Sequence, residues 1–271
     1  MRVASVHIYP VKSTMGHDVE AADVEPWGLA GDRRYLVIDG KGEMLTARQH
    51  PWLLSCRAEV DADGLTLTGP HAAPLRVTPT PRTYTIKVRR TEVELTDCGD
   101  DAAAWLSTLA GEPVRLAWLD DPTRRPVNPE YGRPSDRVSL ADGYPLLLTS
   151  TSSLARLNDW IAETAAERGE EVPVPLAMRR FRPSVVVSGA GEPFEEDGWT
   201  RVRVGEVDFR VAKLCDRCVM TTIDPGTLAK GKEPLRTLAR HRRWDGKVWF
   251  GVNLIPDAPG RVSVDDPVTL L

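Results

Sequence analysis

The sequence predicts a β-rich α+β fold with a few short helices. Short runs of β-branched and aromatic residues, separated by turn residues, fill most of the first hundred positions. Helical periodicity is confined to a few short stretches. With 271 residues, the chain can bury one large core or form two closely associated modules.

The first hundred residues are expected to form a β-meander with a few longer loops. Asp39-Gly40 and Asp63-Gly64 are dipeptides that favour the positive φ angles of tight hairpins. No regular period connects Lys12 to Arg34, and loops on a sheet scaffold commonly carry sites. The expected strands are Val3–Tyr9, Arg34–Ile38, Glu43–Thr46, Leu53–Val60, Leu65–Thr68, Leu75–Val77, Tyr84–Val88 and Glu92–Leu95.

Later in the chain, three helices and a second set of strands are expected. Asp100–Gly111 has acidic residues at its start and a glycine at its end, and Thr151–Gly169 opens with three hydroxyl residues. A third, short helix should follow Pro234. The Pro- and Arg-rich stretch 120–144 is expected to be a long loop, either a lid over a site or a linker. The expected strands are Pro145–Ser150, Val185–Ser188, Arg201–Val204, Val207–Ala212, Val248–Leu254 and Arg261–Leu270.

The composition excludes several function classes. The formal net charge is -4, so the chain has no global positive field that would attract nucleic acid. No run approaches the roughly 18 apolar residues of a membrane helix, and the N-terminus is typical of a strand rather than a signal peptide. Four cysteines are too few for a disulfide scaffold of this size. We therefore expect a soluble cytoplasmic protein with no membrane or nucleic-acid partner.

Residues 213–227 are the strongest candidate for a reactive centre. Two thiols, Cys215 and Cys218, lie beside Arg217 and Lys213, and neighbouring cations favour the thiolate that ligates soft metals. Three other interpretations of Cys-Asp-Arg-Cys are a structural zinc half-site, a dithiol redox pair and two cysteines that merely pack. A closed zinc site needs two further ligands at a suitable spacing. The five histidines are isolated from one another in the sequence: His7, His17, His50, His71 and His241.

Three basic positions are candidate anion sites. Lys12-Ser13 follows a strand and offers an ammonium and a hydroxyl, although Lys12 could equally be a solvated surface lysine. Arg33 beside Asp32 could bind an anion or form a surface ion pair. Arg182 precedes Pro183 and a strand, where its planar fork could face a phosphate or a ring, or simply decorate the barrel rim.

The run Cys-Asp-Arg-Cys-Val-Met-Thr-Thr-Ile-Asp-Pro-Gly-Thr at 215–227 resembles the signature of the MOSC family, the molybdenum-cofactor sulfurase C-terminal domains. Tyr9-Pro-Val-Lys-Ser13 resembles the opening of the partner N-terminal MOSC module, and Glu233–Leu238, Phe250–Asn253 and the C-terminal strand follow in the family's order. The likeness covers nearly the whole chain and is strongest to mitochondrial amidoxime reducing components and bacterial YcbX-type proteins. It implies an N-terminal module at 1–119 and a MOSC β-barrel at 120–271.

This resemblance implies a molybdenum-cofactor-dependent oxidoreductase that reduces N-hydroxylated compounds, such as amidoximes and hydroxylamino bases. Cys218 would be the metal ligand and catalytic residue of a molybdopterin cofactor. A separate electron donor, a ferredoxin, flavoprotein or similar carrier, is implied because the chain shows no cysteine-rich iron–sulfur module and no flavin or haem motif. The implied cofactor contacts are Lys12, Ser13, Arg33, Asp142, Arg182, Ser184, Asp216, Arg217 and Asn253.

Two other function classes remain open at this point. A non-redox carrier of sulfur or of the cofactor would use Cys218 as a persulfide or a ligand, and a β-barrel interaction module would use no chemistry at all. Gly226–Lys232 has the spacing of a nucleotide-binding P-loop, but Glu233 replaces the hydroxyl residue that reaches magnesium, which argues against ATP or GTP binding. Asp224, before Pro225, is expected to cap a turn.

Overall fold

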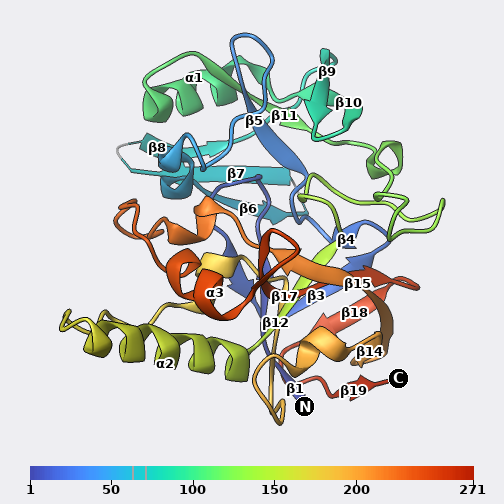
Figure 1. Cartoon of the computed structure of the whole chain (residues 1–271). Coiled ribbons are helices and arrows are strands. Elements are labelled where there is room, and N and C mark those ends of the chain that lie inside the picture. The colour runs from blue at the N-terminus through green and yellow to red at the C-terminus, as the bar shows by residue number, and fades with distance from the viewer. Residues whose placement is uncertain (63, 71) are drawn as a thin grey trace. The chain divides into compact units, whose positions relative to one another are not determined.

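A computed structural model describes residues 1–62, 64–70 and 72–271 (Figure 1). Asp63 of the expected Asp63-Gly64 turn and the single His71 lie outside the described residues. The chain divides into two compact units. Unit 1 comprises Met1–His7, Asp18–Pro26 and Leu146–Leu271, and unit 2 comprises Ile8–His17 and Trp27–Pro145.

Unit 1 is built on a large mixed sheet with the order β19-β14-β15-β17-β12-β13-β1-β2, to which β16 adds by pairing with β17. A short pair, β3 with β18, accompanies it. The strands are β1 (Arg2–Ile8), β2 (His17–Val19), β3 (Ala21–Glu25), β12 (Leu146–Ser150), β13 (Val185–Ser188), β14 (Arg201–Val204), β15 (Val207–Asp216), β16 (Arg243–Trp244), β17 (Lys247–Pro256), β18 (Gly260–Ser263) and β19 (Val268–Leu270).

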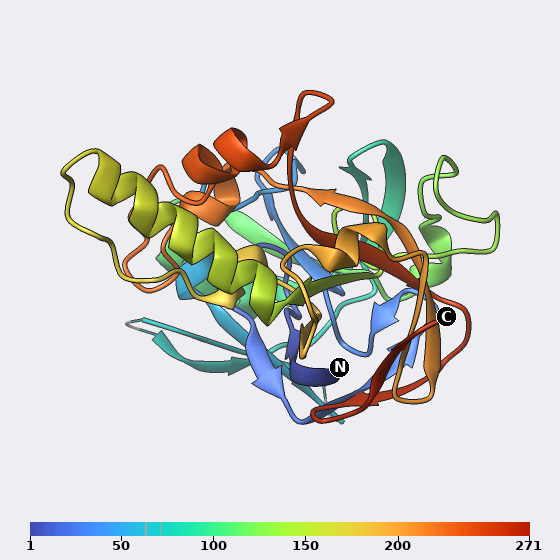
Figure 2. The same ribbon diagram turned by 60° about the horizontal axis from the view of Figure 1, so that its bottom comes forward.

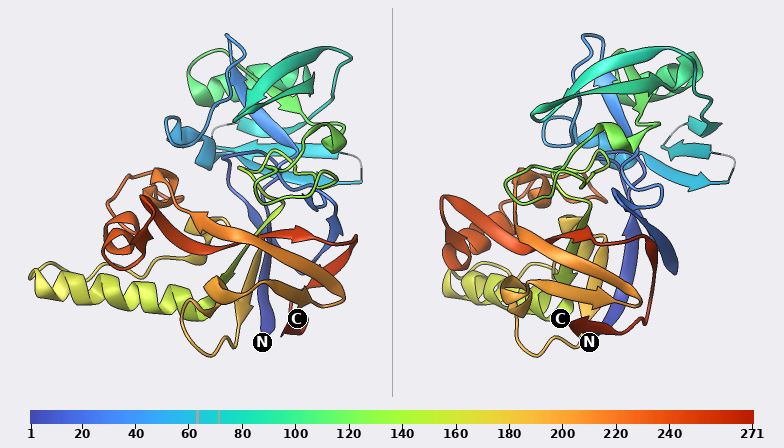
Figure 3. Two further views of the ribbon diagram at one scale, coloured as in Figure 1. Left: turned by 45° about the vertical axis from the view of Figure 1, so that its right-hand side comes forward. Right: turned by 90° about the vertical axis from the view of Figure 1, so that its right-hand side faces the viewer.

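The two longest strands of this sheet, β15 and β17, pair antiparallel along almost their whole length (Figure 3). On the other side of β17, Leu146 to Leu148 of β12 pair with Leu254 to Val252. β12 is buried at every position, which is expected for a central strand covered on both faces. β17 is therefore the strand that connects the buried centre of unit 1 to the end of β15.

Two helices cover unit 1, as Figure 2 shows for the long helix α2 (Thr151–Glu167) and the short helix α3 (Leu235–His241). The Ser150 hydroxyl accepts the backbone N–H of Ser153 and thereby caps the start of α2. Apolar side chains of both helices pack on Phe181 and Phe250, whose rings stack with centroids 4.0 Å apart. This cluster packs the two helices against β17, the strand that pairs with β15.

Unit 2 contains a four-stranded sheet, β5-β11-β10-β9, and a three-stranded sheet, β6-β7-β8. The helix α1 (Gly99–Ala110) packs on β11 and ends at Gly111, which has the left-handed φ of 73°. Buried aliphatic side chains of β5, β9, β10 and β11 form the core. The strands are β4 (Gly28–Leu29), β5 (Tyr35–Asp39), β6 (Arg57–Asp61), β7 (Gly64–Gly69), β8 (Ala72–Arg76), β9 (Thr83–Val88), β10 (Thr91–Asp97) and β11 (Val114–Trp118).

The β-rich α+β class and the three expected helices are confirmed. The stretch 120–144 contains one short 3-10 helix, Pro122–Arg124, and is otherwise irregular, yet Val138 and Leu140 are fully buried. It is therefore a packed part of unit 2, while its role as a lid stays a prediction. The module boundary between residues 119 and 120 also stays a prediction, because the two units are defined by contacts and each combines separate stretches of chain.

Gly251 of β17 should be the most sensitive backbone position in this sheet. It has a φ of 77°, and a Cβ there would lie 2.7 Å from the Leu148 carbonyl oxygen and 2.8 Å from Thr149 Cγ2. We expect Gly251→Ala to lower the free energy of unfolding by about 3 kcal/mol or more, since steric overlap adds to left-handed strain. Urea denaturation measures the change.

Gly246 provides the matched control. It has a similar φ of 69°, but a Cβ added there would have no atom within 4 Å. Gly246→Ala should therefore cost only the left-handed strain of about 1–2 kcal/mol. An equal loss of unfolding free energy in the two variants would show that the close approach of β12 does not add to the cost of a side chain at position 251.

Candidate functional site

The cysteine motif begins in an irregular end of β15. The pairing register of β15 with β17 shifts between Leu214 and Asp216, so Cys215 lies at a bulge. Bulges re-aim side chains at the ends of strands and are frequent beside sites. Immediately after the strand, the Arg217 backbone N–H donates to the Val248 carbonyl of β17 at 2.8 Å. The motif is thus held to the sheet on both sides of the bulge.

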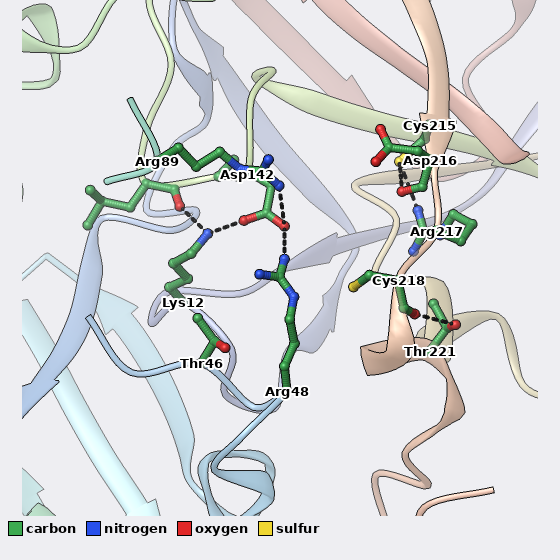
Figure 4. Close-up of polar contacts among 12 residues, drawn as sticks. Lys12, Thr46, Arg48, Arg89, Asp142, Cys215, Asp216, Arg217, Cys218 and Thr221 are labelled. Atoms are coloured by element: carbon green, nitrogen blue, oxygen red, sulfur yellow. Dashed lines mark hydrogen bonds and ion pairs between the residues drawn. The ribbon is translucent and has the colours of Figure 1, made fainter. Parts of the chain in front are cut away.

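Cys218 is fixed by its own backbone. It has an extended conformation and precedes the 3-10 helix Val219–Thr222, and both the backbone N–H and the hydroxyl of Thr221 donate to its carbonyl, at 3.1 and 3.0 Å. Its side chain is partly exposed, and in Figure 4 the sulfur points away from the Cys215 side chain. All four cysteines are thiols. Cys218 is therefore a positioned and reachable thiol.

Arg217 supports the neighbouring thiol. Its guanidinium donates to Cys215 Sγ at 2.9 Å (Figure 4). It also donates to the Phe181 carbonyl at 2.6 Å and lies over the Phe181 ring. Its buried Nε has no hydrogen-bond acceptor among the described residues. A buried N–H without an acceptor lowers the stability of the fold. Arg217 could therefore donate one further hydrogen bond to a bound acceptor.

The other predicted contacts in unit 1 lie on or beside β13, β15 and β17. Arg182 ends the 3-10 helix Met178–Phe181 with a φ of 55°, and Asp216 is exposed at the end of β15. Asn253 donates to the Leu214 carbonyl at 3.3 Å. Ser184 is fully buried and its hydroxyl accepts the backbone N–H of Leu147 at 3.3 Å, so it contributes to the sheet. Their roles as cofactor contacts stay predictions.

In unit 2, three cations converge on Asp142 (Figure 4). Its carboxylate lies 2.5 Å from Lys12 Nζ, 2.9 Å from Arg48 and 3.3 Å from Arg89. Lys12 Nζ also donates to the Leu140 carbonyl at 2.9 Å, and only 6% of the residue is exposed. The cluster has three positive charges against one negative charge, so its chemistry suits an additional anion.

Burial and the neighbouring charges together set the protonation of this cluster. Burial lowers the pKa of Lys12 from 10.5 to about 8, although Asp142 acts in the opposite direction. For Asp142, desolvation acts to raise the pKa, but the attraction of Lys12, Arg89 and Arg48 holds it well below its ordinary value. At neutral pH the ammonium is therefore charged, and Asp142 is a carboxylate. The surface-lysine interpretation of Lys12 is wrong.

Arg33 and Arg125 complete the cationic character of unit 2. Arg33 pairs at 2.5 Å with Asp32, which is fully buried and also accepts the backbone N–H of Tyr9 at 2.8 Å. The pair is therefore not a surface ion pair. Arg125 donates to the carbonyls of Ser139 and Ala141, and burial lowers its pKa to about 10.

Left-handed backbone marks several of these residues. Positive φ angles occur at Ser13 (69°), Arg33 (49°), Arg89 (58°) and Arg182 (55°). Such angles are uncommon outside glycine, and residues held in them cluster at functional sites. The sequence prediction named three of these four residues. It missed Arg89, and also Arg48 and Arg125, because their contacts with Asp142 and with loop carbonyls arise only from tertiary packing.

Two features are absent from residues 1–62, 64–70 and 72–271. No group of three His, Cys, Asp or Glu side chains is arranged to hold a metal ion. No helix in the described part of the chain is long and apolar enough to cross a membrane.

Asp224 accepts the backbone N–H groups of Gly226 and Thr227, each at 2.9 Å, which confirms it as a turn cap.

Comparison with known families defines the class of this protein. The family model of the MOSC N-terminal beta barrel domain matches residues 1–113, and that of the MOSC domain matches residues 135–269. The cysteine motif lies in the second match and Lys12-Ser13 in the first. The chain therefore belongs to the MOSC-domain family, as the motif resemblance predicted.

Individual relatives extend over almost the whole chain. Mitochondrial amidoxime-reducing component 1 of Homo sapiens is 34% identical over 99% of this chain and 82% of its own length. Mitochondrial amidoxime reducing component 2 of Bos taurus is 31% identical over 98% of this chain and 82% of its own. The molybdenum cofactor sulfurase of Danio rerio is 32% identical over 93% of this chain, which corresponds to 31% of that protein.

The electrostatics of Lys12 can be measured directly. We expect its ammonium to titrate near pH 8, and Asp142→Asn to lower this midpoint because the attraction that opposes desolvation is removed. NMR of isotope-labelled lysine Nζ follows the titration. Asp101→Asn, which removes an exposed carboxylate of the same unit, serves as the control and should leave the Lys12 midpoint unchanged.

The lowered pKa of Lys12 also determines how the stability of the protein changes with pH. Between about pH 8 and 10.5, the unfolded chain binds more protons at Lys12 than the folded chain does, so the contribution of Lys12 to stability rises with pH across this window. Its destabilising effect is complete below pH 8. A Lys12 midpoint at or above 10.5 would contradict the burial of this ammonium.

Proposed function

We propose that this protein is a molybdenum-cofactor-dependent reductase of N-hydroxylated compounds, such as amidoximes and hydroxylamino bases, that receives electrons from a separate redox partner. The observation that carries the proposal is Cys218, a partly exposed thiol whose backbone is fixed at the end of β15. It lies within the matched MOSC domain. Relatives named amidoxime-reducing components share about a third of its residues.

The residues fit such a cofactor in charge and in donor type. In unit 1, Cys218 offers a soft sulfur donor, and Arg217 has a buried N–H without an acceptor among the described residues. In unit 2, the excess positive charge around Asp142 suits a phosphate, and Lys12 is charged at neutral pH. Each unit by itself thus supplies one kind of group that an anionic, metal-bearing pterin needs.

The chemistry is divided between the cofactor and the chain. When bound, the molybdenum cofactor would supply the electrons that cleave the N–O bond. The overall reaction takes two electrons and two protons, and it converts the N-hydroxyl group to N–H with release of water. The chain would contribute ligation through Cys218, charge through Lys12 and Arg33, and a rigid support through the Thr221 hydrogen bonds.

The alternative is a carrier that hands on sulfur or the cofactor without redox turnover. A relative named molybdenum cofactor sulfurase keeps this possibility relevant. Both functions use Cys218. They differ in whether its sulfur binds molybdenum or carries a labile sulfur, and in whether the protein turns over substrate. A cytoplasmic location for either activity stays a prediction of the composition.

Serine substitutions separate the two thiols. After expression in a host that makes the cofactor, Cys218→Ser should lose bound molybdenum and lower benzamidoxime reduction by about 100-fold or more, because even the loss of a group that only orients a metal ligand costs about 10–100-fold. Cys215→Ser is the control and should retain most of both. Elemental analysis gives the molybdenum content, and assays with reduced methyl viologen give the turnover.

The outcomes distinguish the hypotheses. Wild-type protein that contains molybdenum and reduces benzamidoxime supports the reductase. Metal-free wild-type protein with a labile sulfur on Cys218 favours the carrier. Full turnover by Cys218→Ser would contradict the assignment of this thiol under either function.

A further inference from the structure

The 230–247 segment is strongly basic in an acidic protein. It carries seven cations, Lys230, Lys232, Arg236, Arg240, Arg242, Arg243 and Lys247, against the two acids Glu233 and Asp245. Seven minus two gives a local charge of +5, whereas the whole chain has a net charge of -4. Charge of one sign concentrated in this way steers association with partners of the opposite sign.

The segment is joined to the cysteine motif at both ends. It begins beyond the turn that follows Cys218, where Gly231 donates its backbone N–H to the Thr222 carbonyl at 2.9 Å. It ends next to Val248, whose carbonyl accepts the Arg217 N–H. Both connections lie within unit 1, so the basic segment lies beside the motif that carries the candidate reactive thiol.

Ion pairs inside unit 1 use only part of this charge. Arg236 pairs with Glu233 and Glu170, Arg240 with Glu167, and Arg242 with Asp197. The remaining four cations, Lys230, Lys232, Arg243 and Lys247, are exposed and form no ion pair with any residue that the structure describes. These four charges are available to an external partner.

A tryptophan hairpin lies in the same surface. β16 and β17 are joined by Asp245-Gly246, both with positive φ, and the hairpin projects beside α3 in Figure 2. Trp244 is 38% exposed, and its ring centroid lies 6.0 Å from that of the buried Trp249. Trp249 pairs with Asp216 across the sheet, two residues before Cys218. Exposed tryptophan beside arginine is typical of protein interfaces.

We propose that the 230–247 segment is the docking surface for an acidic protein that carries a one-electron redox group and reduces this protein. The inference rests on the proposed reductase function. Two such carriers, each giving up one electron, would together supply the two electrons for one N-hydroxyl group, while two protons come from solvent and water is released. Lys247 would pair with a carboxylate of the carrier beside Trp244, its neighbour across the hairpin, and Arg243 would pair with another on the adjoining side of the hairpin.

Charge and composition favour a protein partner over two alternatives. Nucleic acid would meet a chain with net negative charge outside this segment. A membrane surface would meet one large exposed apolar side chain in this segment, Trp244, instead of an apolar face. An acidic protein requires only complementary charge around a small aromatic centre.

Charge reversal on the hairpin tests the proposal with the full chain. The probe is a reduced acidic plant-type [2Fe–2S] ferredoxin, compared with reduced methyl viologen as a small reductant that needs no docking surface. In Arg243→Glu/Lys247→Glu, the ferredoxin-driven rate should fall by about tenfold or more at low ionic strength, while the viologen-driven rate stays within about twofold. Lys41→Glu/Lys87→Glu changes the net charge equally at exposed positions of unit 2 and should leave both rates unchanged.

Binding is measured separately from turnover. By calorimetry, wild-type protein should bind oxidised ferredoxin with an affinity that falls between about 10 and 100 mM ionic strength, as the Debye length shortens from about 30 to 10 Å. The hairpin variant should lose this binding. If wild-type protein shows no viologen-driven turnover, the proposed function fails, and the binding result still tests the surface.

Three results would overturn the docking proposal. The first is an equal loss of ferredoxin and viologen rates in the hairpin variant, which would place the damage in the reactive site. The second is unchanged ferredoxin binding in that variant. The third is binding of duplex DNA or phosphatidylserine vesicles that the hairpin variant loses, in protein that binds no ferredoxin.

Discussion

The pairing of β15 with β17 is the interaction on which the candidate site of unit 1 depends. It delivers Cys215 at a bulge, stops at Asp216, and then holds Arg217 through the Val248 carbonyl. Because β17 is itself paired with the buried strand β12, the cysteine motif is connected to the buried centre of the sheet. The thiol of Cys218 thus gains a fixed position without belonging to the sheet.

Both units contain buried cationic side chains, whose removal from water has a free-energy cost. Lys12 is nearly inaccessible, yet it stays cationic at neutral pH beside Asp142, and Arg217 keeps a buried N–H without a partner among the described residues. Left-handed backbone at Arg33, Arg89 and Arg182 adds strain at the same kind of residue. Such costs are characteristic of binding residues, because a bound anion or acceptor would compensate them.

The sequence predicted the fold class, the helices and most strands because periodicity, caps and turn residues are local signals. It also led to Cys218, Lys12 and Arg33 through short motifs. It missed Arg48 and Arg89, which reach Asp142 only through tertiary packing. It missed the β16–β17 hairpin as well, although Asp245-Gly246 between Trp244 and Lys247 was a usable signal. The burial of Ser184 followed from strand pairing, which no single motif encodes.

X-ray absorption at the molybdenum edge measures whether Cys218 Sγ is bonded to molybdenum. We expect sulfur neighbours of the metal in wild-type protein, one sulfur neighbour fewer for any metal retained by Cys218→Ser, and the wild-type spectrum in Cys215→Ser. Identical sulfur coordination in wild-type and Cys218→Ser protein would show that this thiol is not a ligand of the metal.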